Sequence, residues 1–373
     1  MSDMLNVSDN LAATSAEVIG DGRAVNLTRS QLLIWTGQKL SPGLPLYNMV
    51  MAFRIKGALS ITDFQTSFTR LVLESDAMRT VFCEEDGLPT QSVLNELDFT
   101  LEVIDFSSSE NSEKLAEDWV NKRARQPLDI SKSLFDSFLL RLSDTDWIRY
   151  YNQHHLMNDG WSVTLVFIRV SNYYRELVGD AADKLIPLPP YQDYRMFEAS
   201  QLAKDSDNSA SEYWQEKLRT SSGPLALYGK PPDLRSTAGD RIFAELSREQ
   251  SDILREIAKE PGIRSFTLDL SLYYIFSTLL AALLSRISGQ KSVTFGAPVH
   301  NRSTANFKET IGLFIELFPM QLELDKGDTF RSLLKKTTLE TQNFLRHSGP
   351  GRSTAELNNV FNVTLNFINA SFG

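Results

Sequence analysis

Apolar positions follow two different periods along the chain, and the two alternate. Ile61, Phe64, Phe68 and Leu71 recur at helical spacing, which predicts a core-facing helix over 60–75 that begins with a weak capping box at Ser60. Other stretches, such as 47–57, are short and apolar, and these predict strands.

The whole chain continues this alternation. Helices are expected at 27–40 (with Thr28 as cap), 60–75, 110–126, 162–177, 192–204, 209–219, 248–259, 267–287 and 329–347. Strands are expected at 47–57, 79–85, 89–95, 99–106, 241–246, 292–299, 318–324 and 359–368, with a hairpin over 137–155. Mixed elements without a short repeat predict layered α/β or α+β lobes.

The chain length and the position of a Pro-rich stretch suggest two lobes. The length of 373 residues suits two bodies of about 150–200 residues each. A polar start at 1–24 is expected to be disordered, and the Pro-rich stretch 183–194 is the candidate joint. We therefore expect an N-terminal lobe at 25–182 and a C-terminal lobe at 183–373.

Charge and cysteine content exclude several classes. With 38 basic and 47 acidic residues the net charge is −9, which argues against nucleic-acid binding. One cysteine, Cys83, excludes internal disulfides and is expected to pack, and the start is no secretory signal. The most apolar run, Leu270–Leu284, is shorter than the roughly 20 residues of a membrane span. A cytoplasmic protein without membrane contact is expected.

Two of the four histidines are adjacent, in "HHLMNDG" (154–160). Successive strand side chains point to opposite faces, so one imidazole can face a cleft while the other packs behind it. This geometry disfavours a shared metal, and no metal is expected. The first interpretation is a neutral imidazole that takes a proton near neutral pH. The alternative is two chance histidines satisfied by backbone carbonyls.

The residues after the pair allow two interpretations as well. Asp159 is either a turn former or a structural anchor held by an arginine, and Gly160 permits a tight turn. G-x-S-x-G, the phosphate-binding loop and the dinucleotide fingerprint are missing.

Eight segments in order extend the pattern: "TRSQLLIW" (28–35), "ESDAMRTVF" (74–82), "HHLMNDGWS" (154–162), "YQDYRMF" (191–197), "EYWQEKL" (212–218), "TFGAPVHNR" (294–302), "IGLFIELFP" (311–319) and "NNVFNVTLNF" (358–367). Together they resemble the condensation domains of nonribosomal peptide synthetases, which share the chloramphenicol acetyltransferase-like fold. The resemblance implies an α/β (α+β) chain of two such lobes in a V-shaped pseudo-dimer, with the second lobe incomplete.

The resemblance also implies a reaction and a site. The amine of a carrier-bound aminoacyl acceptor attacks a carrier-bound acyl or peptidyl thioester, and an amide forms. His155 matches the catalytic position, next to His154, and the Gly160 N–H is a candidate oxyanion donor. Asp159 would be structural. Its arginine partner is Arg79 as first choice and Arg302 as second, while Trp161 and Ser162 are expected to bind substrate.

Partners follow from the same resemblance. No metal or small-molecule cofactor is expected on the chain itself, because phosphopantetheine arrives on the donor and acceptor carrier proteins. An adenylation domain of the same synthetase is a further expected partner, and a monomer is expected. "DGWS" favours condensation over epimerization, and the two histidines exclude heterocyclization.

The sequence departs from the family at several points. Glu316-Leu317 stands where Asn-Thr is usual, and Glu74-Ser75-Asp76 replaces Arg-His-Glu. The chain stops just after the last motif, and only about 26 residues precede the first, so a truncated domain supplied with its donor in trans is expected, as a starter or an elongation domain. A noncatalytic carrier-docking module and a free-standing acyltransferase that uses acyl-CoA stay as alternatives.

Overall fold

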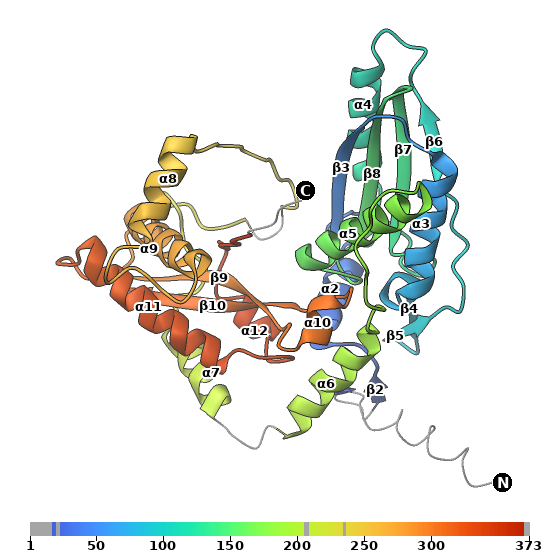
Figure 1. Ribbon diagram of the computed structural model, residues 1–373. Coiled ribbons are helices and arrows are strands. Elements are labelled where there is room, and N and C mark those ends of the chain that lie inside the picture. Colours follow the sequence, from blue (N-terminus) through green and yellow to red (C-terminus); the bar gives the residue numbers. More distant parts are fainter. Residues whose placement is uncertain (1–16, 20–22, 205–208, 234–235, 369–373) are drawn as a thin grey trace. The chain divides into compact units, whose positions relative to one another are not determined.

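The computed structural model describes residues 17–19, 23–204, 209–233 and 236–368, which form two compact units (Figure 1). The first unit comprises the chain up to Lys204 together with Arg302–Phe314. The second comprises Asp205–Asn301 and Ile315–Ser371. This division differs from the expected one, because residues 183–204 and 302–314 belong to the first unit.

A carboxylate explains why the Pro-rich joint stays with the first unit. Asp76 accepts the backbone N–H groups of Tyr191 at 2.8 Å and Gln192 at 3.0 Å, at the start of α6 (Tyr191–Lys204). A negative charge at a helix N-terminus satisfies amides that have no partner inside the helix. The helix is thereby fixed to the N-terminal half of the chain.

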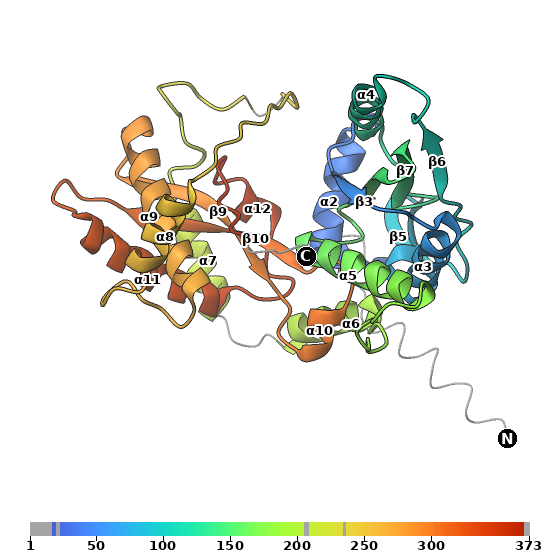
Figure 2. The same cartoon turned by 45° about the horizontal axis from the view of Figure 1, so that its top comes forward.

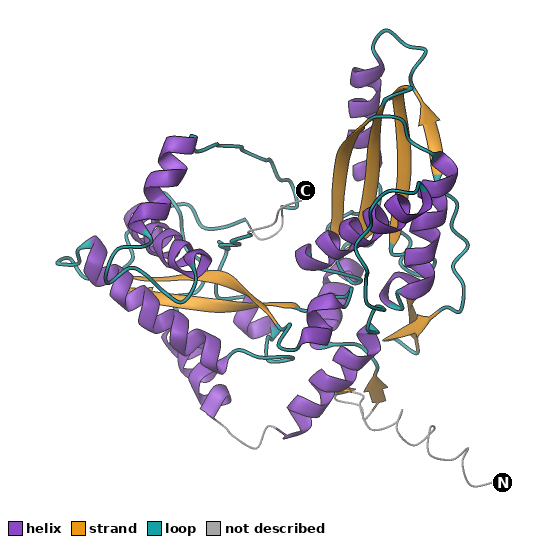
Figure 3. Ribbon diagram, in the orientation of Figure 1, coloured by secondary structure: helices purple, strands orange, loops and turns teal. Residues whose placement is uncertain are grey.

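A four-stranded sheet forms the centre of the first unit (Figure 3). Its order is β3-β8-β7-β6, and all pairs are antiparallel except β6 with β7. The strands are β3 (Asn48–Lys56), β6 (Glu102–Asp105), β7 (Phe135–Ser143) and β8 (Asp146–His154). The predicted hairpin of 137–155 is confirmed as β7 and β8, turning after Ser143.

Helices cover both faces of this sheet. On one face, α4 (Ser112–Ala124) packs Trp119 edge-on against Tyr150 of β8. On the other face, α3 (Ile61–Glu74) places Phe68 against the ring of Tyr151, and α5 (Gly160–Leu177) contacts α3. Because both faces are covered, the side chains of β8 are buried from Arg149 to its end at His154.

Caps and turns set the remaining boundaries of the first unit. Thr28 caps helix α2 (Arg29–Leu40), as predicted, and together with Gln31 it forms a full capping box. The hairpin of β4 (Thr80–Glu85) and β5 (Leu88–Val93) turns at Asp86 and Gly87, both at positive φ. Two such residues match the right-handed twist of the paired strands.

The second unit is built on one antiparallel pair, β9 (Ser292–His300) and β10 (Ile315–Glu323) (Figure 2). Its core contains Phe295, Phe318 and Met320, each without exposed surface, and Trp214 stacks on Phe318. The surrounding helices are α7 (Ser209–Thr220), α8 (Arg248–Ile257), α9 (Leu268–Ser288), α11 (Phe330–His347) and the short α12 (Ala355–Asn358).

Helix α9 is longer than the apolar run that predicted it. Its 21 residues are long and apolar enough to cross a membrane by length and composition alone. One face of the helix is buried, however, and Tyr274 and Ile275 pack with Leu334 of α11. A single helix of this kind is weak evidence for a membrane span, since core helices of soluble proteins share these features.

Three local predictions are corrected. Residues 241–246 form a loop and no strand, with Phe243 exposed, and the strand expected at 359–368 is reduced to one bridge between Thr364 and Gly296. Cys83 is exposed rather than packed. Most of the disordered stretch expected at 1–24 lies outside the described residues, but Glu17–Ile19 (β1) pairs with Arg23–Val25 (β2).

Candidate active site

The histidine pair lies between the end of one element and the start of the next. His154 is the last residue of β8, and Gly160 is the first of α5. Asp159 is the N-cap of that helix, with extended backbone, and accepts the Ser162 N–H at 2.9 Å. Aspartate is favoured at this position because its carboxylate accepts an amide that lacks a helical partner. The loop 155–159 is therefore fixed at both ends.

The two histidines have different environments, as strand alternation predicted. His154 is 1% exposed, and burial followed by the neighbouring His155 lowers its pKa to about 3. Its Nδ1 accepts the Leu156 N–H at 3.2 Å, and its Nε2 lies 3.3 Å from Gln38 Oε1. A neutral ring with both nitrogens engaged is a structural group.

His155 is half-buried and has a different pattern of contacts. Its backbone N–H donates to the Tyr47 carbonyl at 2.9 Å. Its ring Nδ1 is buried and has no hydrogen-bond partner among the described residues. Buried ring nitrogens are normally paired, so an unpaired one is a candidate for contact with a ligand.

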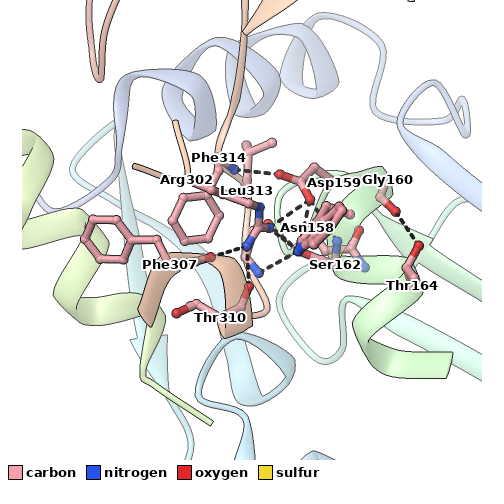
Figure 4. A network of polar contacts seen from close by, with 12 residues as sticks. Asn158, Asp159, Gly160, Ser162, Thr164, Arg302, Phe307, Thr310, Leu313 and Phe314 are labelled. Carbon is pink, nitrogen blue, oxygen red and sulfur yellow. Dashed lines mark hydrogen bonds and ion pairs between the residues drawn. The ribbon is translucent and has the colours of Figure 1, made fainter. Parts of the chain in front are cut away.

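Asp159 is the centre of a buried polar network (Figure 4). Oδ1 accepts from Arg302 Nη2 at 2.9 Å and from Ser162, and Oδ2 accepts the Phe314 N–H at 3.1 Å. Burial raises the pKa of Asp159, but the Arg302 charge and the backbone N–H donors outweigh it, so the net pKa is lowered. The residue is therefore a buried carboxylate held in its charged form.

Arg302 also forms hydrogen bonds within its own segment, residues 302–314. Its Nη1 donates to the carbonyl oxygens of Phe307 and Thr310 at 2.5 and 2.6 Å, on either side of the end of α10 (Ala305–Glu309). Its guanidinium lies 3.9 Å from the centre of the Phe314 ring. Arginine suits this position because its planar group donates in several fixed directions at once.

Ser162 and Gly312 complete the network. Ser162 Oγ accepts the Gly312 N–H at 3.0 Å and lies 2.7 Å from the Gly312 carbonyl oxygen. Because Ser162 has no exposed surface, its geometry supports a structural role rather than the expected contact with substrate. A side chain at Gly312 would come within 2.0 Å of the Tyr191 ring, whose hydroxyl donates to the Leu313 carbonyl at 2.6 Å.

Gly160 and Trp161 are both exposed at the start of α5. A Cβ at Gly160 would meet nothing within 4 Å, and its φ is not positive, so neither a tight turn nor close packing requires this glycine. Trp161 is 45% exposed, and its ring Nε1 donates to the Lys308 carbonyl at 2.7 Å. The first amides of a helix have no intrahelical acceptor, so they can donate to a ligand.

The structure reverses the ranking of the two arginines. Arg79, the first choice, donates to the carbonyl oxygens of Leu94 and Asn95 after β5. Arg302, the second choice, pairs with Asp159. Arg79 is nearer to Asp159 in the chain than Arg302 is, but its side chain binds the end of its own hairpin.

Sequence reasoning missed Gln38 as a site residue, and gave Gln31 no role beyond matching a motif. Both lie on α2, seven residues apart, which places them on one helix face. Gln31 Nε2 donates to the Leu156 carbonyl at 3.2 Å. The available signal was the spacing of two glutamines after a predicted cap. No group of three or more metal-ligating side chains gathers within the described ranges.

Comparison with known proteins identifies the family. The condensation-domain family model matches residues 22–359, so the chain belongs to the condensation domains. It is 30% identical over 334 residues to a linear gramicidin synthase of Brevibacillus parabrevis, and the match covers 87% of this chain and 6% of that protein. It is 28% identical over 320 residues to phosphinothricin tripeptide synthetase PhsC of Streptomyces viridochromogenes, and that match covers 84% and 29%.

The chain thus spans less than a third of the length of each of these relatives. Solved structures confirm the predicted fold. The first condensation domain of the calcium-dependent antibiotic synthetase with substrate analogue 2a matches at a TM-score of 0.74 and 22% identity, covering 86% of this chain and 74% of that one. The starter condensation domain of rhizomide synthetase matches at 0.69 and 23%, covering 88% and 73%.

Proposed function

We propose that this condensation domain joins a carrier-bound acyl or peptidyl thioester to the amine of a carrier-bound aminoacyl group. The observation that carries the proposal is His155, a half-buried histidine with an unpaired ring nitrogen and a fixed backbone. Family membership supplies the reaction class, and condensation domains catalyse amide formation.

In the proposed reaction, bonds form and break only between the two reactants. The acceptor nitrogen attacks the thioester carbon, a C–N bond forms, the C–S bond breaks, and the proton lost by nitrogen is balanced by the one that the leaving thiolate gains. His155 accepts or orients the amine proton. Such help is typically worth roughly 10²- to 10⁴-fold, and placing two tethered reactants together supplies more.

The start of α5 supports stabilisation of the developing oxyanion. The Gly160 amide begins the helix, at the end where the helix dipole is positive. Trp161 stays a candidate substrate contact because it is exposed beside this amide. Asp159 and Arg302 hold the helix start and touch neither reactant.

Phosphopantetheine would enter on donor and acceptor carrier proteins, and an adenylation domain would load the acceptor. Both partners are inferred from the relatives, which are named as a linear gramicidin synthase subunit and a tripeptide synthetase. The chain itself would supply the proton acceptor and the helix amide.

The test uses an aminoacyl-carrier acceptor and a panel of acyl and peptidyl thioester donors, with mass spectrometry of the carrier arm. We expect product from the wild type and a loss of roughly 10²-fold or more in His155→Ala. His347→Ala is the matched control, because His347 is also half-buried but stacks on Tyr213 in the second unit.

The outcomes separate the alternatives. Equal product from wild type and His155→Ala removes His155 from the chemistry. Carrier binding without product from any variant indicates a docking module, and product from acyl-CoA alone indicates a free-standing acyltransferase. The donor that is accepted distinguishes a starter from an elongation domain.

A further inference from the structure

Two independent partners determine the protonation of the buried His154. Gln38 Nε2 donates to the carbonyl oxygens of Ser41 at 3.1 Å and Leu44 at 3.0 Å. Carbonyls only accept, so the amide nitrogen of Gln38 must face them and its Oε1 must face His154. His154 Nε2 therefore carries the proton, and Nδ1 is free to accept the Leu156 N–H.

The Leu156 peptide is thus held from both sides. Its N–H donates to His154 Nδ1, and its carbonyl accepts from Gln31 Nε2 at 3.2 Å. The amide orientation of Gln31 is also fixed, since its Oε1 accepts the Thr28 N–H at 3.0 Å. With the His155 N–H on the Tyr47 carbonyl, the backbone on each side of His155 is pinned.

We infer that Gln38 is a positioning residue, which fixes the Nε2–H tautomer of His154 and through it the Leu156 peptide and the direction of the His155 ring. The inference rests on the proposed function in one respect, the reactive role of His155. The tautomer itself can be measured without any substrate.

The logic also predicts what breaks the arrangement. If His154 gained a second proton, Nδ1 would become a donor facing the Leu156 N–H, and that hydrogen bond would be lost. Burial opposes this, because it disfavours the charged ring. A carboxylate in place of the Gln38 amide would favour the charged ring and oppose the effect of burial.

The experiment labels the protein with ¹⁵N-histidine and follows the ring nitrogens by NMR against pH. Only four histidines are present, so His155→Ala, His300→Ala and His347→Ala identify the other three signals and leave that of His154. In the wild type we expect His154 to stay neutral in the Nε2–H form well below pH 6, the range in which an ordinary histidine titrates. A wild-type His154 in the Nδ1–H form, or one that titrates near neutral pH, would overturn the inference whatever the activity.

Two variants connect the tautomer to turnover. Gln38→Met keeps the size but removes the acceptor for His154, together with the amide donor to the Ser41 and Leu44 carbonyls. We expect a mixed tautomer and a fall in kcat of about 3- to 10-fold with KM unchanged, the factor for the one hydrogen bond to His154. Gln38→Glu is expected to raise the His154 pKa, so that kcat declines as pH falls through the raised value. Gln201→Met, an exposed position on α6, is the control and should change neither.

The experiments distinguish failure of this inference from failure of the proposed function. If Gln38→Met is folded by circular dichroism and leaves tautomer and kcat unchanged, the inference is overturned while the proposed function stands. If the wild type forms no amide, the proposed function fails, and the NMR titration alone then decides whether Gln38 fixes the tautomer. If Gln38→Met does not fold, the pH dependence of Gln38→Glu decides instead, and a profile equal to the wild type contradicts the inference.

Discussion

Replacing Asp159 by asparagine tests whether the buried ion pair holds the site together. The substitution keeps the shape but removes the charge, and it leaves Arg302, 8% exposed, without its counter-ion. The amide can keep an oxygen toward Ser162 and Arg302, but its nitrogen then faces the Phe314 N–H, where Oδ2 now accepts. A donor would face a donor there.

The expected magnitude follows from these losses. Breaking a buried ion pair by removing one partner costs about 3–5 kcal/mol, because the other charge stays buried. We therefore expect the free energy of unfolding of the first unit to fall by this amount at neutral pH. Urea titration followed by circular dichroism measures it, and hydrogen exchange of α5 peptides assigns the transition to the first unit.

The pH dependence gives a second check with a definite sign. The folded pKa of Asp159 lies below its ordinary value, so its stabilisation is complete above the unfolded pKa of about 3.9. That stabilisation is lost as pH falls through the folded pKa. The difference between wild type and Asp159→Asn should therefore be largest at neutral pH and shrink below about pH 4.

A double-mutant cycle with Arg302→Met completes the test. The losses of unfolding free energy in the two single variants should sum to much more than the loss in the double variant. The reason is that the second substitution removes the charge that the first left unpaired. Asp105→Asn, which breaks an exposed pair with Arg141, is the control and should have little effect. A change within about 0.5 kcal/mol for Asp159→Asn, the size of an ordinary surface substitution, would refute the reasoning.

Three further substitutions test other parts of the structure. Gly312→Ala places a Cβ 2.0 Å from the Tyr191 ring and should cost about 1–3 kcal/mol in urea unfolding; an unchanged midpoint would contradict this packing. Gly160→Ala meets nothing within 4 Å and should change stability by no more than about 0.5 kcal/mol, so a large loss would show an unseen contact. Glu316→Gln turns an amide toward one of three N–H donors and should cost about 1–3 kcal/mol, whereas Glu323→Gln, exposed on the same strand, should not.

The elements that the sequence predicted well are those with local signals. Caps such as Thr28 and Ser60, and the periods of the segments that follow them, depend on residues three or four positions apart. The predictions of strands at 241–246 and 359–368 were wrong because strand formation depends on distant residues. Their short apolar runs are compatible with a strand, but a strand also needs a partner along its length, and residues 241–246 have none in the described part of the chain.

In the candidate site too, the features with a local signal were predicted better than those that depend on distant residues. The separation of the two histidines followed from strand alternation, and both nitrogens of His154 are engaged while His155 keeps one unpaired. Arg302 was named as a partner of Asp159 only as second choice, because 143 residues separate the two and nothing local ranks it above Arg79. Gln38 was missed since the seven-residue spacing from Gln31 is the only local signal, and spacing does not tell a buried amide from an exposed one.

The position of Arg302–Phe314 explains why this part of the site depends on long-range contacts. The segment belongs to the first unit although nearly all its sequence neighbours belong to the second. Within thirteen residues it supplies the counter-ion of Asp159, a glycine that admits the Tyr191 ring, and the Phe314 amide that binds the second carboxylate oxygen. Each contribution needs a different residue type at one position, so none produces a period or a run. The start of α5, and with it the loop that carries His155, is therefore held by a segment in which the sequence alone indicated only Arg302, as a second choice.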